Sequence, residues 1–412
     1  MVKQGYKQTE VGLIPEDWDC AKFGEKVKIY RGGSPRPIQD YITHLSTGIN
    51  WIKIGDVGEN DKYIRSTQEK IIPEGVSKSR EVRVGDFILS NSMSFGRPYI
   101  LDIDGCIHDG WLTIQEYKNT FHTEYLYYLL SSNLIYQQYI SMAAGSSVKN
   151  LNKDKVFALN VIYPTLLEQE RIAEALSDVD SLISSLEKLI AKKKAVKQGA
   201  MQELLTGKKR LPGFTGEWHH EPFGKLCTIC RGGSPRPIQD YLTTSDSGIN
   251  WIKIGDVKPN AKYITSTQEK IVESGVSMSR RVYKGDFILS NSMSFGRPYI
   301  LKLDGCIHDG WLAIQDYQVA FDTDFLYYVL GSNYVFEQYI QMAAGSSVQN
   351  LNKEKVAQLK LYIPALEEQT AIASILSDMD NEIEALEQKL EKTHQIKQGM
   401  MQQLLTGKIR LV

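Results

Sequence analysis

The sequence contains the same unit twice, and this repeat limits the possible folds more than any other feature. Residues 31–160 align with residues 231–360 at a constant offset of 200 without a gap, and 92 of the 130 aligned positions are identical. An internal repeat of this length predicts two copies of one folded unit. The chain is therefore expected to present two matched surfaces, which can bind two copies of one target.

The first part of each unit has the pattern of a mixed α/β domain. Residues 49–57 and 86–90 predict short strands that end in polar or glycine-containing turns. Residues 123–144 predict one helix, which Gly145 would end. Its aromatic and aliphatic side chains are expected to pack into a core, with stacking on nucleic-acid bases as the alternative. These side chains are Tyr125, Leu126, Tyr128 and Leu129.

The second part of each unit is predicted to be a long helix. Thr165 and Glu168 form a capping-box pattern, in which each side chain accepts a hydrogen bond from a backbone N–H of the first turn. Apolar residues then alternate in steps of four and three, which predicts a coiled-coil seam. Thr206 and Gly207 end the helix, so about 40 residues would form a rod of roughly 60 Å. The seam residues are Ile172, Leu176, Val179, Ile183, Leu186 and Ile190.

The second long helix keeps this seam, although only 25 of 50 positions are identical between residues 161–210 and 361–410. Ala365 replaces the capping Thr165, which costs about 1 kcal/mol of local stability. Two such helices from one repeat are expected to pair antiparallel, with one globular domain at each end. The alternative is that each helix packs on its own domain or on another protein. The second seam is Ile372, Leu376, Met379, Ile383, Leu386 and Leu390.

The expected fold class is α+β. Two similar mixed α/β globular domains would be joined and separated by two long antiparallel coiled-coil helices, with internal pseudo-twofold symmetry. The expected boundaries are 1–163 and 208–363 for the two domains, and 164–207 and 364–412 for the two long helices.

Composition narrows the function. The net charge of −1 gives no overall basic field, so binding to nucleic acid must rest on local patches. The polar N-terminus does not resemble a signal peptide, and no apolar run is long enough to predict a membrane helix. Five cysteines, an odd number, fit a reducing compartment. We therefore expect a cytoplasmic protein.

Standard catalytic motifs are absent. The sequence lacks a nucleotide-binding glycine loop, the tetrad of adenine methyltransferases, and the protease, hydrolase and deaminase signatures. His108-Asp109 and His308-Asp309 could form acid–base pairs, but a lone pair in a glycine-rich turn is more often structural. Cys227 and Cys230 form one CxxC, whereas zinc sites usually need four ligands, so small buried hydrophobic residues are the better interpretation. The chain therefore has the features of a recognition or scaffold protein, without a catalytic or metal site.

Three polar stretches are candidates for contact with DNA. Arginine suits phosphate oxygens and guanine, and glycine and proline shape a loop around it. Each stretch recurs in the second copy, and the first two recur without any change. The candidates in the first copy are Arg31, Ser34, Arg36, Asn91, Ser92, Ser94, Arg97 and Lys149. Those in the second copy are Arg231, Ser234, Arg236, Asn291, Ser292, Ser294, Arg297 and Asn350.

The whole chain resembles specificity (S) subunits of type I restriction–modification systems. The resemblance rests on the openings at Glu10–Trp18 and Arg210–Trp218 and on the Pro-x-x-x-Glu-Gln entry to each long helix. It rests most of all on the tail IKQGMMQQLLTGKIRL at Ile396–Leu411. Together and in this order, these motifs are a specific match.

The resemblance implies two target recognition domains and two conserved spacer helices in a non-catalytic subunit that binds double-stranded DNA. It also implies two modification (methyltransferase) subunits with S-adenosylmethionine, and restriction subunits that use ATP and Mg²⁺. This chain itself would bind no cofactor.

Members of the family usually carry two dissimilar recognition domains, whereas these two are nearly identical. We therefore expect both domains to recognise the same half-site, in a palindromic or near-palindromic bipartite target. Two alternatives remain open at this point: a self-sufficient DNA-modifying enzyme, and a scaffold that binds protein or glycan.

Overall fold

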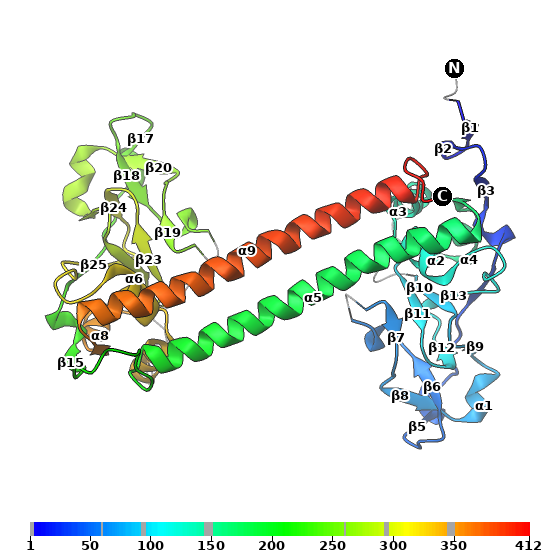
Figure 1. Ribbon diagram of the computed structural model, residues 1–412, viewed down its shortest axis with the longest axis horizontal. Helices are drawn as coiled ribbons and strands as arrows, with labels where there is room; N and C mark the ends of the chain where they lie inside the picture. Colours follow the sequence, from blue (N-terminus) through cyan, green and yellow to red (C-terminus); the bar gives the residue numbers. More distant parts are fainter. Residues whose placement is uncertain are drawn as a thin grey trace. The chain divides into compact units, whose positions relative to one another are not determined.

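The computed structural model describes residues 4–58, 61–91, 96–143, 151–258, 261–291, 296–343 and 351–412. The chain divides into two compact units (Figure 1). The first combines Met1–Glu187 with Lys389–Val412, and the second is Lys188–Gln388. Each unit therefore holds one globular domain and part of each long helix, so the division falls inside the helices.

Two five-stranded mixed sheets form the domain of the first unit, in the orders β4-β13-β10-β11-β7 and β5-β8-β6-β12-β9. Two smaller pairs, β1-β2 and β3-β14, complete its strands. The strands are β1 (Tyr6–Thr9), β2 (Gly12–Pro15), β3 (Asp19–Lys22), β4 (Lys28–Arg31), β5 (Ile42–Thr43), β6 (Ile49–Ile52), β7 (Tyr63–Ile64), β8 (Glu69–Ile71), β9 (Arg80–Val82), β10 (Phe87–Ser90), β11 (Pro98–Leu101), β12 (Gly105–Ile107), β13 (Trp111–Gln115) and β14 (Asn160–Tyr163). The helices are α1 (Pro73–Val76), α2 (Thr123–Leu130), α3 (Asn133–Ala143), α4 (Lys153–Phe157) and the long α5 (Leu166–Leu204).

The second unit repeats both sheets, in the orders β16-β25-β22-β23-β19 and β17-β20-β18-β24-β21, and the β15-β26 pair replaces β3-β14. Its strands are β15 (His219–Pro222), β16 (Thr228–Arg231), β17 (Leu242–Thr243), β18 (Ile249–Ile252), β19 (Tyr263–Ile264), β20 (Glu269–Ile271), β21 (Arg280–Val282), β22 (Phe287–Ser290), β23 (Pro298–Leu301), β24 (Gly305–Ile307), β25 (Trp311–Gln315) and β26 (Lys360–Ile363). Its helices are α6 (Thr323–Leu330), α7 (Asn333–Ala343), α8 (Lys353–Ala357) and the long α9 (Leu366–Leu404). A 3-10 helix, Glu273–Met278, takes the place of α1.

Strand β10 lies between two cores. Phe87 and Leu89 belong to the core that α2 covers, and Ile88 belongs to a second core with Ile52 and Trp111. Because side chains alternate along a strand, the uninterrupted apolar run of β10 fits a strand that is buried on both faces.

The helix predicted over residues 123–144 is instead two helices, α2 and α3. Ser132 ends one and begins the other: its hydroxyl donates to the carbonyl of Leu129 at 2.6 Å, and Oγ accepts from the N–H of Ile135 at 3.4 Å. The predicted core face is confirmed, since Tyr125, Leu126, Tyr128 and Leu129 are at most 1% exposed. Gly145 lies outside the described residues.

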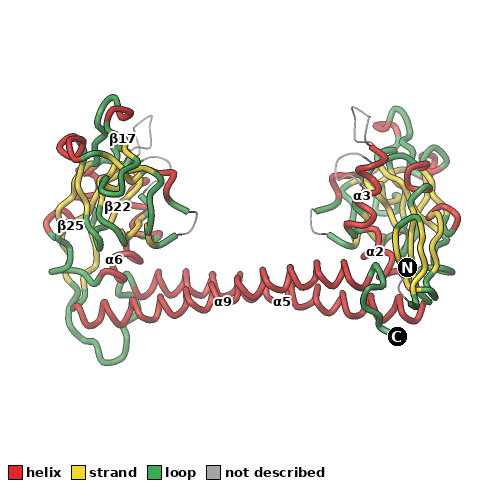
Figure 2. The backbone as a smooth tube through the Cα atoms, turned by 90° about the horizontal axis from the view of Figure 1, so that it is seen from above, coloured by secondary structure: helices red, strands yellow, loops and turns green. Residues whose placement is uncertain are grey.

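The long helices run antiparallel within each unit. In the second unit Lys194 pairs with Glu387 and Lys197 with Asp380, so partner numbers in α9 fall as those in α5 rise. Ile172 of α5 and Leu404 of α9 share a core with the buried face of α2 in the first unit. Ile372 of α9 and Leu204 of α5 share the corresponding core with α6 in the second unit. Each helix therefore packs on its own domain as well as on the other helix, so the alternative packing also occurs. Figure 2 shows the two helices as long tubes.

A polar junction ties the first domain to both helices. The Tyr128 hydroxyl of α2 donates to Asp180 Oδ2 of α5 at 2.7 Å, and Lys397 Nζ of α9 lies 2.5 Å from Asp180 Oδ1. Tyr328, Asp380 and Lys197 repeat these contacts in the second unit.

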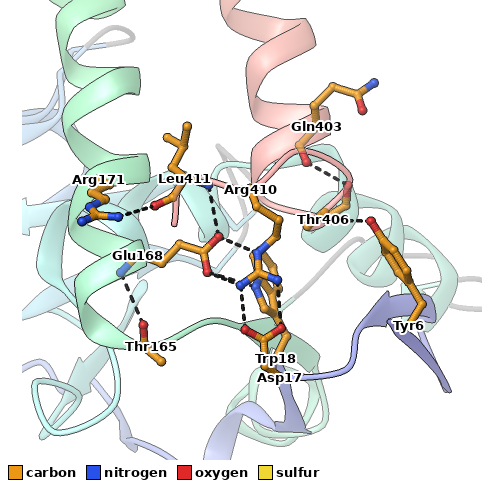
Figure 3. Close-up of polar contacts among 11 residues, drawn as sticks. Tyr6, Asp17, Trp18, Thr165, Glu168, Arg171, Gln403, Thr406, Arg410 and Leu411 are labelled. Atoms are coloured by element: carbon orange, nitrogen blue, oxygen red, sulfur yellow. Dashed lines mark hydrogen bonds and ion pairs between the residues drawn. The ribbon is translucent and has the colours of Figure 1, made fainter. Parts of the chain in front are cut away.

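The capping box at Thr165 forms only in part. The backbone N–H of Glu168 donates to Thr165 Oγ1 at 3.5 Å, but the Glu168 carboxylate turns away to accept from Arg410, Trp18 and the N–H of Leu411 (Figure 3). Arg410 also binds Asp17 through two hydrogen bonds of 2.8 and 2.7 Å. A buried carboxylate gains more from a guanidinium than from a backbone N–H.

The second unit builds the same contact from different parts of the chain. Arg210 donates to both oxygens of Glu368 at 2.7 Å, and Trp218 Nε1 donates to the same carboxylate at 3.1 Å. In the first unit the buried glutamate is therefore bound by an arginine of the tail and a tryptophan near the N-terminus. In the second unit the segment after α5 supplies both the arginine and the tryptophan.

Candidate nucleic-acid interface

The loop after β4 is held against the turn that follows β12. The N–H of Gly32 donates to the carbonyl of Trp111 at 2.9 Å, and that of Gly33 donates to the carbonyl of Ile107 at 3.1 Å. A Cβ on Gly32 would lie 2.0 Å from the carbonyl oxygen of His108, so only glycine fits there. The peptide bond between Arg36 and Pro37 is cis. This close approach places the arginine loop, residues 31–37, beside His108 and Asp109.

Asp109 is the centre of the site. Its carboxylate accepts from the Ser34 hydroxyl at 2.9 Å and from Arg36 at 3.4 Å. Its backbone carbonyl accepts from Arg31 at 3.4 Å and from the Asn91 side chain at 3.1 Å. Four predicted contact residues are therefore gathered around one aspartate, which was weighed from the sequence as an acid–base partner of His108 or a structural residue, but not as part of the interface.

The second unit repeats this geometry around Asp309. Ser234 donates to its carboxylate at 2.9 Å, Arg236 lies at 3.4 Å, and Asn291 donates to its backbone carbonyl at 2.9 Å. The peptide bond that follows Arg236 is again cis. Sequence identity in these loops is thus matched by the same placement of the serine, the asparagine and the arginine before the cis peptide bond, whereas the contact of Arg31 has no counterpart at Arg231 among the contacts of the described residues.

The site combines a fixed anion with exposed cations. The hydrogen bond from Ser34 lowers the pKa of Asp109, and the charge of Arg36 acts in the same direction, so Asp109 is ionised at neutral pH. At Asp309 burial acts to raise the pKa, but the hydrogen bond from Ser234 and the charge of Arg236 act against it, and the pKa is lowered as well. The side chains of Arg36 and Arg236 are 81% and 82% exposed. The two arginines can therefore reach a ligand while a carboxylate fixes one side of each.

His108 has a structural role in the turn. Its Nδ1 accepts from the N–H of Gly110 at 2.9 Å, and His308 accepts from Gly310 at 2.6 Å. Burial lowers the pKa of His308, which favours the neutral ring. A nitrogen occupied in this way is not available as a general base.

The remaining predicted residues lie in different surroundings. Asn91 and Asn291 were predicted to contact DNA, but they are only 8% and 6% exposed, because each one bridges two loops. Asn91 also accepts from the N–H of Leu151 through its backbone carbonyl at 2.8 Å. Arg97 and Arg297 lie over the rings of Tyr99 and Tyr299, at 5.6 Å. Ser92, Ser94, Lys149, Ser292, Ser294 and Asn350 lie outside the described residues.

Further cations, which were not predicted from the sequence, border the site of the first unit. Arg80 and Lys153 lie over the ring of Tyr30, at 4.7 and 5.9 Å from its centroid. Lys78 lies over Tyr41 at 4.7 Å. The signal available in the sequence was that Arg80 and Lys153 recur as Arg280 and Lys353.

The cysteines of the CxxC pattern behave as packed thiols. Cys227 Sγ donates to the carbonyl of Phe223 at 3.3 Å, and burial raises its pKa to about 12. Within the described ranges, no three His, Cys, Asp or Glu side chains gather as metal ligands. No helix in the described part of the chain is long and apolar enough to cross a membrane.

Comparison with known proteins identifies the family. The model of the type I restriction modification DNA specificity domain matches the chain twice, at residues 15–198 and 216–395. The chain therefore belongs to the family of type I restriction–modification DNA specificity subunits. It is the DNA-recognition component, and catalysis in such systems belongs to the partner subunits.

Similar proteins cover nearly the whole chain. A putative type I restriction enzyme MjaX specificity subunit of Methanocaldococcus jannaschii is 27% identical, over 99% of this chain and 97% of its own. The MjaVIII specificity subunit of the same organism is 23% identical, with the same coverage.

Solved structures share the fold. The HsdS subunit of Thermoanaerobacter tengcongensis has a TM-score of 0.56 at 19% identity, covering 99% of this chain and 100% of its own. A chain from a study of complex assembly and conformational transition in the type I R-M system has a TM-score of 0.66 at 19% identity, with 96% and 99% coverage.

Proposed function

We propose that each domain binds DNA through the cluster around Asp109 or Asp309, and that both domains recognise the same half-site. The observation that carries this proposal is the repeated geometry, in which Ser–Asp and Arg–Asp distances agree between the two units. Arginine side chains of this kind form paired hydrogen bonds to phosphate or to guanine. Two identical clusters predict two identical half-sites.

The half-sites should be inverted in the target. Each domain precedes its own long helix, and the helices run in opposite directions within each unit. Domains that follow the direction of their helices would meet opposite strands of the duplex, which gives a palindromic or near-palindromic bipartite motif.

We further propose partners that match those of the family. Two modification subunits would bring S-adenosylmethionine, and restriction subunits would bring ATP and Mg²⁺. With a net charge of −1, the isolated chain would bind DNA weakly, so the partners would supply part of the affinity.

Methylation sequencing tests this proposal. The subunit is expressed with its modification subunits in a host that lacks other methyltransferases, and the methylated motif is read from the genome. We expect two identical half-sites in inverted order around a nonspecific spacer. Two unrelated half-sites would contradict the proposal, and so would methylation without sequence preference.

A further inference from the structure

The two candidate interfaces share their centre but differ at their edges. Residues 31–41, 91–97 and 104–112 are identical to their counterparts 200 residues later. Beside them, Tyr30 and Lys78 of the first copy are replaced by Cys230 and Met278. Both differences fall on groups that border the arginine loop.

Lys78 lies directly beside this loop. A Cβ placed on Gly33 would lie 3.1 Å from the backbone oxygen of Lys78, and the Ser79 hydroxyl donates to the carbonyl of Ile107 at 3.0 Å. The Lys78 ammonium is exposed and hydrogen-bonds the Tyr41 hydroxyl. In the second unit Met278 occupies this position with 42% exposure, so this edge has lost one cation.

Tyr30 supports two more cations. Its ring lies under Arg80 and Lys153, whereas Cys230 presents no ring to Arg280 and Lys353. Cations held in place before binding lose less conformational freedom when a ligand arrives. The first interface therefore has the Lys78 cation and an aromatic ring under two further cations at this edge, where the second has Met278 and Cys230.

Other charge changes lie nearby. Positions 73 and 74 are Pro and Glu in the first copy and Glu and Ser in the second, so one negative charge has moved by a single residue. Position 81 is Glu in the first copy and Arg in the second. Successive side chains of a strand point to opposite faces, so residue 81 leaves β9 on the face away from Arg80. Arg281 lies 3.7 Å from Glu273, which offsets its charge.

We propose that the two domains recognise the same half-site with unequal affinity. Lys78, together with Arg80 and Lys153 over the ring of Tyr30, would give the first domain the tighter binding. Their ligand would be the DNA backbone next to the half-site, because exposed lysines beside a recognition loop typically contact phosphates and fix its register. This inference rests on the proposed function.

The exchange of one residue tests it. The complete complex with modification subunits is titrated onto a duplex that carries the motif found by methylation sequencing. Log affinity falls as log salt rises, so the slope is negative. Lys78→Met should make this slope shallower by about 0.9, and Met278→Lys should make it steeper by about 0.9. Between about 50 and 200 mM salt, each change corresponds to a factor of about three in affinity. The double variant should restore the original slope.

A duplex with one half-site scrambled isolates the stronger domain, and there Lys78→Met should weaken binding about threefold or more. Lys118→Met is the matched control, because Lys118 is exposed beside Gly85, at the opposite end of β10 from Asn91. The fold accepts methionine at position 78, since the second copy has it. Unchanged slopes with intact motif preference would overturn the inference alone, whereas equal binding to motif and scrambled duplexes would overturn the proposed function.

Discussion

At the scale of single residues, Asp109 fixes the positions of the groups around it. A carboxylate repels DNA phosphates, so its presence among exposed arginines must serve another purpose. Its two oxygens take separate partners, Ser34 and Arg36, and its backbone carbonyl takes Arg31 and Asn91. The geometry fits a residue that weakens nonspecific attraction to DNA but fixes the orientation of the Arg36 side chain.

Asp109→Asn separates these two effects. The amide keeps the size of the side chain but removes the charge that lies 3.4 Å from Arg36. We expect tighter binding to unrelated DNA and about a tenfold loss of preference for the motif, within the range of one specific base contact. Fluorescence anisotropy of the assembled complex on motif and scrambled duplexes measures both quantities.

Asp309→Asn should have the same effect, because its partners are the same. Asp102→Asn is the control, since that carboxylate is half-exposed and pairs with Arg65 at 3.3 Å. Preference that stays intact in Asp109→Asn would show that Arg36 needs no such support.

At the scale of elements, Glu168 joins the start of α5 to two distant segments. It is 3% exposed, and Arg410 of the tail and Trp18 of the opening both donate to it. Arg410→Met would leave this carboxylate buried without its cation, which should lower the free energy of unfolding of the first unit by about 3–5 kcal/mol. Urea unfolding of the purified subunit, followed by tryptophan fluorescence, gives the value.

Two variants show whether this loss is specific. Arg210→Met should cost a similar amount in the second unit, where Glu368 is 1% exposed. Arg65→Met, in a pair with two exposed partners, should cost less than about 1 kcal/mol. Equal small losses in all three variants would mean that the buried contact does not hold the tail.

The periodic spacing of apolar residues predicted the long helices, because a coiled-coil seam requires that spacing. The seam of α5 followed from its period, and Ile172, Leu176, Ile183, Leu186 and Ile190 are all buried. The end near Gly207 followed from glycine chemistry, and its φ is +71°. The break within residues 123–144 was missed, because the apolar spacing continues across it and only the hydrogen bonds of Ser132 reveal the interruption.

Contacts between distant residues left no local signal. Ser34 and Asp109 are 75 residues apart, and Glu168 and Arg410 are 242 residues apart. Near Thr165 the local pattern was misleading, because a capping box and a buried ion pair require the same glutamate. The arginine loop itself was found from composition and repetition, but its central carboxylate could be identified only from the fold.

At the scale of the whole molecule, the two long helices connect the units, so their length is a candidate for setting the spacer between half-sites. The units divide after Glu187 in α5 and after Gln388 in α9. Inserting one heptad at both points keeps the seam in register on each side and lengthens the pair by about 10 Å. We expect a spacer longer by about three base pairs, at roughly 3.4 Å each.

Affinity should fall even where the motif shifts as expected. Three base pairs rotate one half-site by about a third of a turn, since a turn of DNA holds about 10.5 base pairs. A heptad in a coiled coil completes two turns, so it hardly rotates the attached domain. A heptad in α5 alone is the control, because it displaces the seam against α9 and should reduce folding rather than shift the motif. A methylated motif with an unchanged spacer in the double insertion would show that contacts with the partner subunits, and not helix length, set the distance.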